Sequence, residues 1–479
     1  MIHTDKTYKP TPYEGAGDLQ SGKVLQRLRV ASKFRVGPLT GPRDQDQDQQ
    51  SATSEGYPVD NYNPVDSFLE VSDRNLYSGQ LTTVGFYQHI LLGEHLSVAY
   101  GPLLRKIQAP ASNPLIVIRS TSYNRTIQSV AAMLSSFLPY SVHFSDVHIH
   151  FQPHSSLENM HGFVSNKVHS SGSPTLGGQI TVHDDVSSKS TLKKAAKASN
   201  CPKATAALRR MASSYDDTTP ETFQRLTNIY SPLVMQPYST LAHITEVADP
   251  LMTSFCHQER FACGQESRKC GSESLLRAVM VDSDRSFCER YTSVDGGLEY
   301  TRLDIYPFMT EVKDALVAAA EEVYSRPKSG SSSSSSSDSH HPSSSPPLVH
   351  VFSGHDTVIA PVLTALGIYQ HSSFCNWPNY ASRIAFEAWS PVGKNAKKYS
   401  KHRGEGNKMF SLQNSNIHVR VVYNGVDVTG HIPACATASV QYGKKKGAVR
   451  ASLCPLELFV KQIESNLGGS ESLEEACQR

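Results

Sequence analysis

The sequence has no long apolar run, no large excess of charge of either sign and no closely spaced cysteine pair. No stretch approaches the roughly 18 to 20 apolar residues that span a bilayer. The formal net charge of the 479 residues is only +2, which argues against the clustered basic face of a nucleic-acid-binding protein. None of the nine cysteines forms a CxxC pair, which argues against a zinc knuckle. We therefore expect no zinc knuckle and no nucleic-acid partner.

The nine cysteines are spread widely, and eight of them lie beyond residue 250. This spacing fits either the disulfides of a secretory protein or buried free thiols, and we favour disulfides. The odd count leaves at least one thiol unpaired within the chain. The first thirty residues nevertheless have no apolar core of signal-peptide type. This conflict predicts that the natural start of the protein lies upstream of Met1.

Composition divides the chain into four parts. Residues 1–66 are polar and rich in turn formers, which predicts a poorly ordered segment. Residues 67–150 and 345–479 alternate strand and helix patterns, which predicts one α/β domain. Residues 151–326 are less regularly patterned, which predicts an inserted, mainly helical lobe. Residues 327–347 contain seven consecutive serines among prolines, which predicts a disordered loop.

Apolar periodicity places the elements of the α/β domain. Helical spacing predicts helices, and short apolar or alternating runs predict strands. The predicted helices cover residues 83–100, 125–139 and 310–326. The predicted strands cover residues 114–118, 146–152, 383–389 and 418–429. Asn424-Gly425 is a two-residue hairpin signal, and residues 347–368 predict a strand, a tight turn and a helix.

Arg119 follows directly after the predicted buried strand 114–118. Ligands of open α/β sheets bind beyond the carboxyl ends of strands, and a guanidinium offers a planar fork of donors that matches phosphate oxygens. The helix that opens six residues later adds free N–H groups and a partial positive charge. Arg125, in its first turn, is a second cation. The alternative, which this segment taken alone favours, is a strand-end arginine in a structural ion pair.

Gly354, His355 and Asp356 also lie between a buried strand and a helix. Gly354 permits a tight turn, and His355 can donate hydrogen bonds to a phosphate. Asp356, at a helix N-terminus, could protonate a leaving alcohol. The alternative is that Asp356 only caps the helix and His355 fills space. Because both segments have the same strand–charge–helix form, we expect them to converge on one edge of the sheet.

Three segments, in order, resemble the histidine acid phosphatase family. QLTTVGFYQHILLGEHL (80–96) is similar to its LT-x-x-G-x-x-Q-x-x-x-LG helix, RSTSYNRTIQSVAAMLSSFLP (119–139) to its phosphate-binding arginine segment, and SGHDTVIAPVLTALGI (353–368) to its His-Asp segment. The resemblance implies a central mixed sheet flanked by helices, with an inserted helical lobe. It also implies a phosphoric monoester hydrolase without a metal or other cofactor, in which Arg119 and His355 bind phosphate and Asp356 is the general acid.

The family's nucleophile has no counterpart in the sequence. In relatives, a histidine of an Arg-His-Gly-x-Arg-x-Pro motif attacks phosphorus, and this sequence contains no Arg-His-Gly. Arg35-Val36-Gly37 has the outline of the motif, but valine cannot attack phosphorus. The spacing in relatives places the motif at or just before Met1, so we expect a truncated gene product. Without the nucleophile, the 479-residue chain is expected to be inactive or nearly so.

The C-terminal part resembles the Golgi branch of the family. The segments RIAFEAW, RVVYNGVDVT and CPLELFVKQI carry this resemblance. It implies removal of a 2-O-phosphate from xylose in the linkage region between glycosaminoglycan and protein, in the Golgi lumen, with a membrane anchor ahead of the present sequence. Cys435 with Cys454 is the first disulfide that we expect. Asn124 opens a glycosylation sequon beside Arg119, where a glycan would crowd the pocket.

Two other functions remain open. One is a broad acid phosphatase or inositol-polyphosphate phosphatase on the same fold. The other is a non-catalytic protein that binds phosphate or a phosphorylated glycan and keeps Arg119 and His355 without the nucleophile. The sequence does not decide the oligomeric state.

Overall fold

The structure is a computed structural model of the 479-residue chain. It describes residues 35–38, 81–104, 116–121, 124–138, 148–151, 201–214, 221–230, 244–257, 260–261, 263, 268–325, 349–371, 373–390, 416–436, 440–442 and 451–478.

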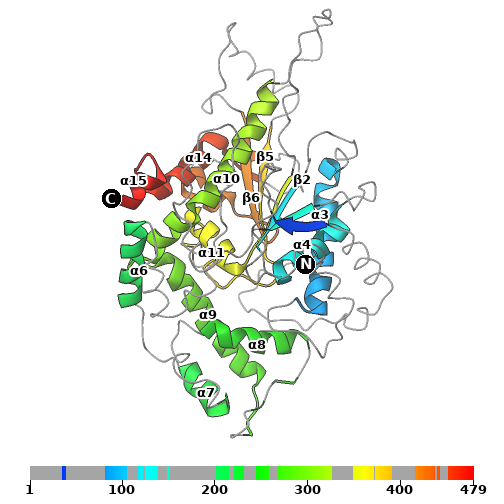
Figure 1. Ribbon diagram of the computed structural model, residues 1–479, viewed down its shortest axis with the longest axis vertical. Coiled ribbons are helices and arrows are strands. Elements are labelled where there is room, and N and C mark those ends of the chain that lie inside the picture. The colour runs from blue at the N-terminus through cyan, green and yellow to red at the C-terminus, as the bar shows by residue number, and fades with distance from the viewer. Residues whose placement is uncertain are drawn as a thin grey trace, which may run out of the picture.

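A sheet of four parallel strands positions the candidate site. Across the sheet the order is β1 (Arg35–Pro38), β3 (His148–Phe151), β2 (Ile116–Ser120) and β4 (Val349–Ser353). The helices α3 (Thr83–Leu104) and α4 (Asn124–Phe137) lie next to each other beside β2 (Figure 1). Ile118 of β2 is buried in the apolar cluster that these two helices form. They approach closely at Gly93, where an added Cβ would lie 2.1 Å from the carbonyl oxygen of Met133.

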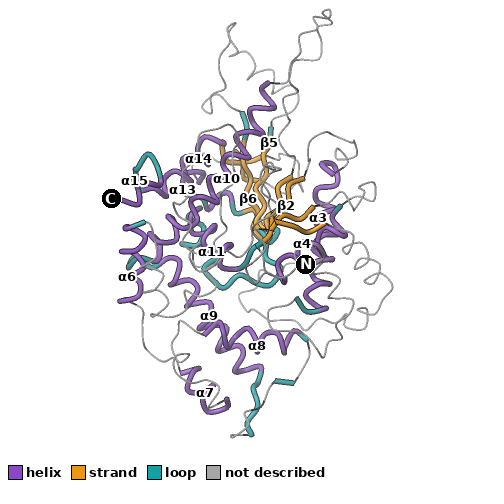
Figure 2. The backbone as a smooth tube through the Cα atoms, viewed as in Figure 1, coloured by secondary structure: helices purple, strands orange, loops and turns teal. Residues whose placement is uncertain are grey.

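A second sheet is antiparallel. Its path is β5 (Ile384–Trp389), β6 (His418–Tyr423), β9 (Ala451–Pro455) and β8 (Val440–Tyr442), and β7 (Val426–Asp427) also pairs with β6. Figure 2 shows β5 and β6 of this sheet side by side. Asn424 and Gly425 form the β6–β7 turn with φ angles of 49° and 85°, as their hairpin signal predicted. The α/β fold class is confirmed. Among the described strands, the parallel pairs and the antiparallel pairs lie in two separate sheets, where the resemblance implied one mixed sheet.

Helices make up most of the remaining described structure. They are α6 (Pro202–Ser214), α7 (Glu221–Tyr230), α8 (Ile244–Cys256), α9 (Glu273–Thr292), α10 (Gly297–Ser325), α11 (Asp356–Ala365), α13 (Pro433–Ala436), α14 (Leu456–Glu464) and α15 (Leu473–Gln478), with 3-10 turns η8 (Thr429–His431) and η9 (Ser465–Leu467). The largest apolar cluster joins α9, α10, α11, β6 and α14, and a separate cluster joins α7, α8 and α9.

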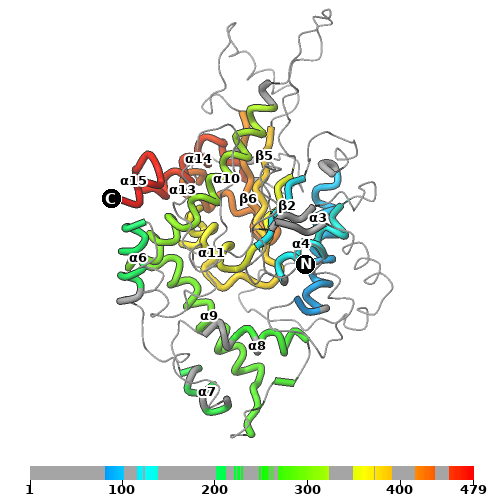
Figure 3. Tube along the Cα trace, in the orientation of Figure 1, coloured from blue at the N-terminus to red at the C-terminus, as the bar shows by residue number. Residues whose placement is uncertain are grey.

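Helix α10 contributes to two apolar clusters. Met309 and Leu316 are buried in the largest cluster, whereas Leu303 packs with α6 and α15. Figure 3 shows α15, at the red end of the chain, near α6. The division into an α/β domain and an inserted lobe stays a prediction. The predicted disordered segments 1–66 and 327–347 lie outside the described residues, apart from β1.

Four disulfides confirm the interpretation of the cysteines. They are Cys201–Cys477, Cys263–Cys270, Cys288–Cys375 and the predicted Cys435–Cys454. Cys256 is the thiol that the odd count leaves free. In the part of the chain that the structure describes, no helix combines the length and the apolar character needed to cross a membrane.

Most predicted elements are present, with shifted ends. Thr82 caps α3, since its Oγ accepts a hydrogen bond of 3.1 Å from the amide of Gly85. The predicted strand 114–118 lies two residues later, as β2. The predicted helix 310–326 is the second half of α10, which begins at Gly297 and carries Pro307 in its interior.

Candidate active site

The two strands that precede the candidate residues are neighbours. In their parallel register Arg119 lies opposite Phe352 and Ser120 opposite Ser353. The pairing continues past the strand ends, because the amide of Thr121 donates a hydrogen bond of 3.1 Å to the carbonyl oxygen of Ser353. The loops after β2 and β4 therefore leave the same edge of the sheet side by side, which is the convergence that the sequence led us to expect.

His355 is buried in a network of hydrogen bonds. Its Nδ1 lies 3.4 Å from Nη2 of Arg125, and its Nε2 lies 3.0 Å from Oγ1 of Thr121. A guanidinium can only donate, so Nδ1 accepts and the ring proton belongs on Nε2, which donates to Thr121. The Thr121 hydroxyl then donates over 2.8 Å to Thr126, whose own hydroxyl donates to the Thr121 carbonyl oxygen over 3.0 Å. This assignment makes His355 a neutral imidazole next to a cation.

Arg119 faces a different partner. Both ends of its guanidinium donate to the carboxylate of Glu311 on α10, with Nη1 at 3.1 Å from Oε1 and Nη2 on Oε2. The guanidinium carbon lies 4.6 Å from the centre of the Phe352 ring. Only 8% of the Arg119 side chain and 14% of the Glu311 side chain are exposed. This is the structural ion pair that the sequence left open, and the cation that contacts His355 is Arg125.

Asp356 is the first residue of α11, and both of its carboxylate oxygens accept hydrogen bonds. Oδ1 accepts from the amide of Thr357 at 2.9 Å, and Oδ2 accepts from the indole Nε1 of Trp377. Burial raises the pKa of Asp356, and these two donors oppose that rise. The nearby carboxylate of Asp249 raises the pKa further, whereas Arg290 lowers it. A buried carboxyl with a raised pKa holds its proton longer, as a general acid must.

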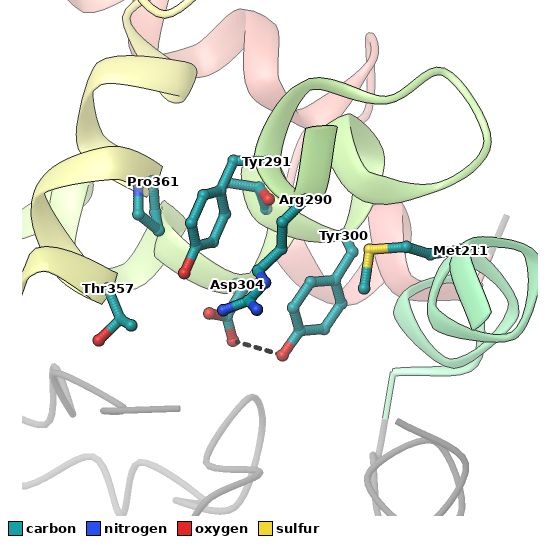
Figure 4. A pocket seen from close by; sticks show the side chains of 8 residues that line it. Met211, Arg290, Tyr291, Tyr300, Asp304, Thr357 and Pro361 are labelled. Carbon is teal, nitrogen blue, oxygen red and sulfur yellow. Dashed lines mark hydrogen bonds between the residues drawn. The ribbon is translucent and has the colours of Figure 1, made fainter. Parts of the chain in front are cut away.

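A pocket lies on the flank of α11 beside Asp356. Its lining includes Thr357, the residue after the carboxyl, together with Arg290 and Tyr291 of α9 and Tyr300 and Asp304 of α10. Figure 4 shows Arg290 and Asp304 between the two tyrosine rings, with the Tyr300 hydroxyl donating to Asp304 over 3.4 Å. This polar hollow therefore comes from helices that sequence reasoning did not connect with the site.

Three residues of the site carried no signal in the sequence. Glu311 is 192 residues from Arg119, and Trp377 is 21 residues from Asp356. Thr121 lies in the loop after β2, where its hydroxyl could have been noticed only by knowing the position of His355. Among the described residues, no group of three His, Cys, Asp or Glu side chains is arranged to hold a metal ion.

Comparison with known proteins places the chain among phosphatases. The family model described as histidine phosphatase superfamily (branch 2) matches residues 39–424. The chain is similar to 2-phosphoxylose phosphatase 1 of Mus musculus, with 22% identity over 417 residues, which are 84% of this chain and 65% of that protein. It is also 22% identical over 419 residues to the Homo sapiens protein of the same name, covering 84% and 66%. The chain thus spans 65% of the mouse relative's length.

Solved structures of phytases are more distant. The chain is 12% identical to the phytase from Citrobacter braakii, covering 82% of this chain and 89% of that one, with a TM-score of 0.39. The apo form of Hafnia alvei phytase is 15% identical, covers 90% and 93%, and also has a TM-score of 0.39.

Proposed function

The chain belongs to the histidine phosphatase superfamily, and we propose that it binds phosphate monoesters at Arg125 and His355 and that Asp356 protonates the leaving alcohol. The observation that carries this proposal is the contact of a guanidinium with a buried imidazole one residue before a carboxyl of raised pKa. Beside a nucleophile, cleavage of a phosphate ester needs a cation, a hydrogen-bond donor and an acid, and the site holds these three groups.

Each group has a defined task in the proposed reaction. Arg125 donates N–H bonds to the phosphoryl oxygens as negative charge gathers on them, and His355 does so once its Nε2–H turns from Thr121 to the phosphate. A nucleophile forms a bond to phosphorus as the bond between phosphorus and the ester oxygen breaks; it is a histidine in the covalent route that the family resemblance implies, and water where that histidine is absent. The proton of Asp356 passes to the ester oxygen so that an alcohol leaves. Asp356 then needs a proton from water before the next cycle. Arg119 stays a predicted phosphate ligand, but it could bind phosphate only by leaving Glu311.

The proposed covalent route needs a nucleophile that this sequence does not carry in the family's motif. In an Arg-His-Gly motif the histidine takes the phosphoryl group before water releases it, and no such motif occurs in the 479 residues. We therefore expect the 479-residue chain to bind phosphate with little turnover. The same absence favours a second candidate function, a non-catalytic protein that binds phosphate or a phosphorylated glycan.

For the substrate, we propose a 2-O-phosphorylated xylose of a proteoglycan linkage glycan. The support is the name of the relatives, 2-phosphoxylose phosphatase 1, at 22% identity. We propose the Golgi lumen as the site of action, and the four disulfides support a secretory compartment because cytosolic thiols stay reduced.

Two measurements on the purified chain test these proposals. Isothermal titration with inorganic phosphate should show saturable binding that Arg125→Ala and His355→Ala each weaken. A phosphomonoesterase assay should then show turnover far below that of a full-length relative. Phosphate binding that neither substitution changes would overturn the proposed site. Turnover equal to that of the relative would overturn the claim that the missing motif limits this chain.

A further inference from the structure

The Asp356 carboxyl is held by a residue outside its own helix. We infer that Trp377 is a positioning residue, which fixes the orientation of the Asp356 carboxyl through the indole N–H and so aims its proton at the leaving oxygen. This inference rests on the proposed role of Asp356 as the acid. Nothing in the family resemblance or in the sequence pattern singled out Trp377.

The carboxyl is restrained from two directions. Its Oδ1 accepts from the amide of Thr357, which belongs to the first turn of α11, and its Oδ2 accepts from the Trp377 indole. A carboxyl bound at one oxygen can rotate about its Cβ–Cγ bond, whereas donors on both oxygens fix the plane of the group. An acid restrained in this way does not have to rotate before it donates its proton to the leaving oxygen. Orientation matters because small displacements of reacting groups lower the reaction rate strongly.

The position of Trp377 is itself fixed by α9. Its backbone amide donates over 2.9 Å to Oδ1 of Asp284. Its ring stacks on Phe287, with centroids 6.0 Å apart and planes 29° from parallel. The Cys288–Cys375 disulfide ties the same segment to the same helix two residues before the indole. The amide anchor, the ring stack and the disulfide together hold the indole N–H in one place.

Trp377 also lies where two apolar clusters meet. It packs against the largest cluster and against the cluster of α7, α8 and α9. The groups that face the carboxyl–indole contact therefore come from several elements. The titratable and charged ones are Asp249 of α8, Asp284, Arg290 and Tyr291 of α9, and Tyr369 after α11.

The chain has only two tryptophans, which makes the contact measurable without catalysis. Trp389→Phe leaves Trp377 as the sole indole, and its emission can be followed between about pH 3 and pH 9. We expect a transition above the ordinary range of aspartate, because protonation of Asp356 changes the field at the indole. Adding Asp356→Asn should remove that transition. A transition that Asp356→Asn leaves unchanged would overturn the inference.

Asp284 is the other carboxyl that touches Trp377, and burial raises its pKa to about 6. Asp284→Asn in the same single-tryptophan protein separates the two carboxyls. The asparagine still offers an oxygen to the Trp377 amide, so the indole should stay in place and the Asp356 transition should remain. Loss of the whole transition in Asp284→Asn, with no effect of Asp356→Asn, would also contradict the inference.

Kinetics test the positioning role itself. Trp377→Phe keeps the ring and removes the N–H, so the residual kcat for an alkyl phosphate such as glycerol phosphate should fall about tenfold to a hundredfold. The kcat for p-nitrophenyl phosphate, whose leaving group needs little protonation, should change less than about twofold. The loss of activity at high pH should move to higher pH, since the lost donor had lowered the pKa of Asp356. A merely structural role would lower both rates alike.

Trp389→Phe is the matched control. Trp389 donates to Glu387 at 2.9 Å and has no part in the site, so neither the ratio of the two rates nor the pH profile should change. If the chain hydrolyses neither ester, the proposed hydrolysis fails, and the emission titration still decides whether Trp377 holds Asp356. If hydrolysis is found and Trp377→Phe leaves ratio and profile unchanged, the inference fails while the function stands.

Discussion

Replacing Arg119 by alanine separates its two possible roles, because a structural ion pair and a phosphate ligand respond differently. The substitution leaves the Glu311 carboxylate without its partner, and only 14% of that side chain is exposed. Breaking a buried pair by removing one partner costs about 3 to 5 kcal/mol. We expect a loss of unfolding free energy near the lower value, because neither side chain is fully buried. Phosphate affinity should change little.

Arg125→Ala should show the opposite behaviour. Arg125 is only half-buried, and its partner His355 is neutral in our assignment. Stability should therefore fall by less than about 1 kcal/mol, in the usual range for a lost hydrogen bond. Phosphate affinity should fall about tenfold to a hundredfold, because a hydrogen bond to a charged group contributes about 1.5 to 3 kcal/mol.

Urea unfolding followed by tryptophan emission and a phosphate titration measure both quantities on the same proteins. The control is Arg119→Met with Glu311→Leu, which removes both charges and should be about as stable as the natural chain. If Arg119→Ala leaves stability unchanged and abolishes phosphate binding, the structural assignment is wrong and Arg119 is the ligand that the sequence predicted.

Three further predictions concern stability. Cys435→Ala with Cys454→Ala removes a disulfide that spans 19 residues and should lower the unfolding free energy by about 3 kcal/mol. Urea titrations under non-reducing conditions measure this loss, and an unchanged midpoint of the unfolding transition would contradict the pairing. Burial raises the pKa of Asp284 to about 6, so between the pKa of the unfolded state, about 4, and that of the folded state the folded protein binds the extra proton. The unfolding free energy should therefore fall by up to about 3 kcal/mol as pH rises from about 4 to about 6. Asp284→Asn should flatten that slope. Gly93→Ala drives a Cβ into the carbonyl of Met133 and should cost about 1 to 3 kcal/mol, measured by the same unfolding, whereas Gly101→Ala, at a position with open space, should not.

The sequence predicted those parts of the fold that depend on local patterns. The strand–turn–helix at 347–368, the Asn424-Gly425 hairpin and the helix capped by Thr82 all follow from neighbouring residues. The start of α10 was missed because a proline usually ends a helix, whereas Pro307 lies inside this one. Ile305 and Phe308, on both sides of the proline, are buried in the largest apolar cluster.

The sequence could place Arg119, His355 and Asp356 at strand ends, but it could not choose their partners. Strand ends are set by local pattern, and neighbouring strand ends share a sheet edge. The partners Glu311 and Trp377 come from α10 and from the segment after α11, and their approach depends on how the helices pack. For the same reason, the sequence could not place Glu311 opposite Arg119, and the binding of phosphate by Arg119 stays a prediction.

A crystal structure of the 479-residue chain with inorganic phosphate tests most directly whether one phosphate binds against Arg125 and His355. We predict density for the anion within hydrogen-bond distance of the Arg125 guanidinium and the His355 ring, with Arg119 still bound to Glu311. Density on Arg119 with Glu311 displaced, or an anion remote from both Arg125 and His355, would contradict the account.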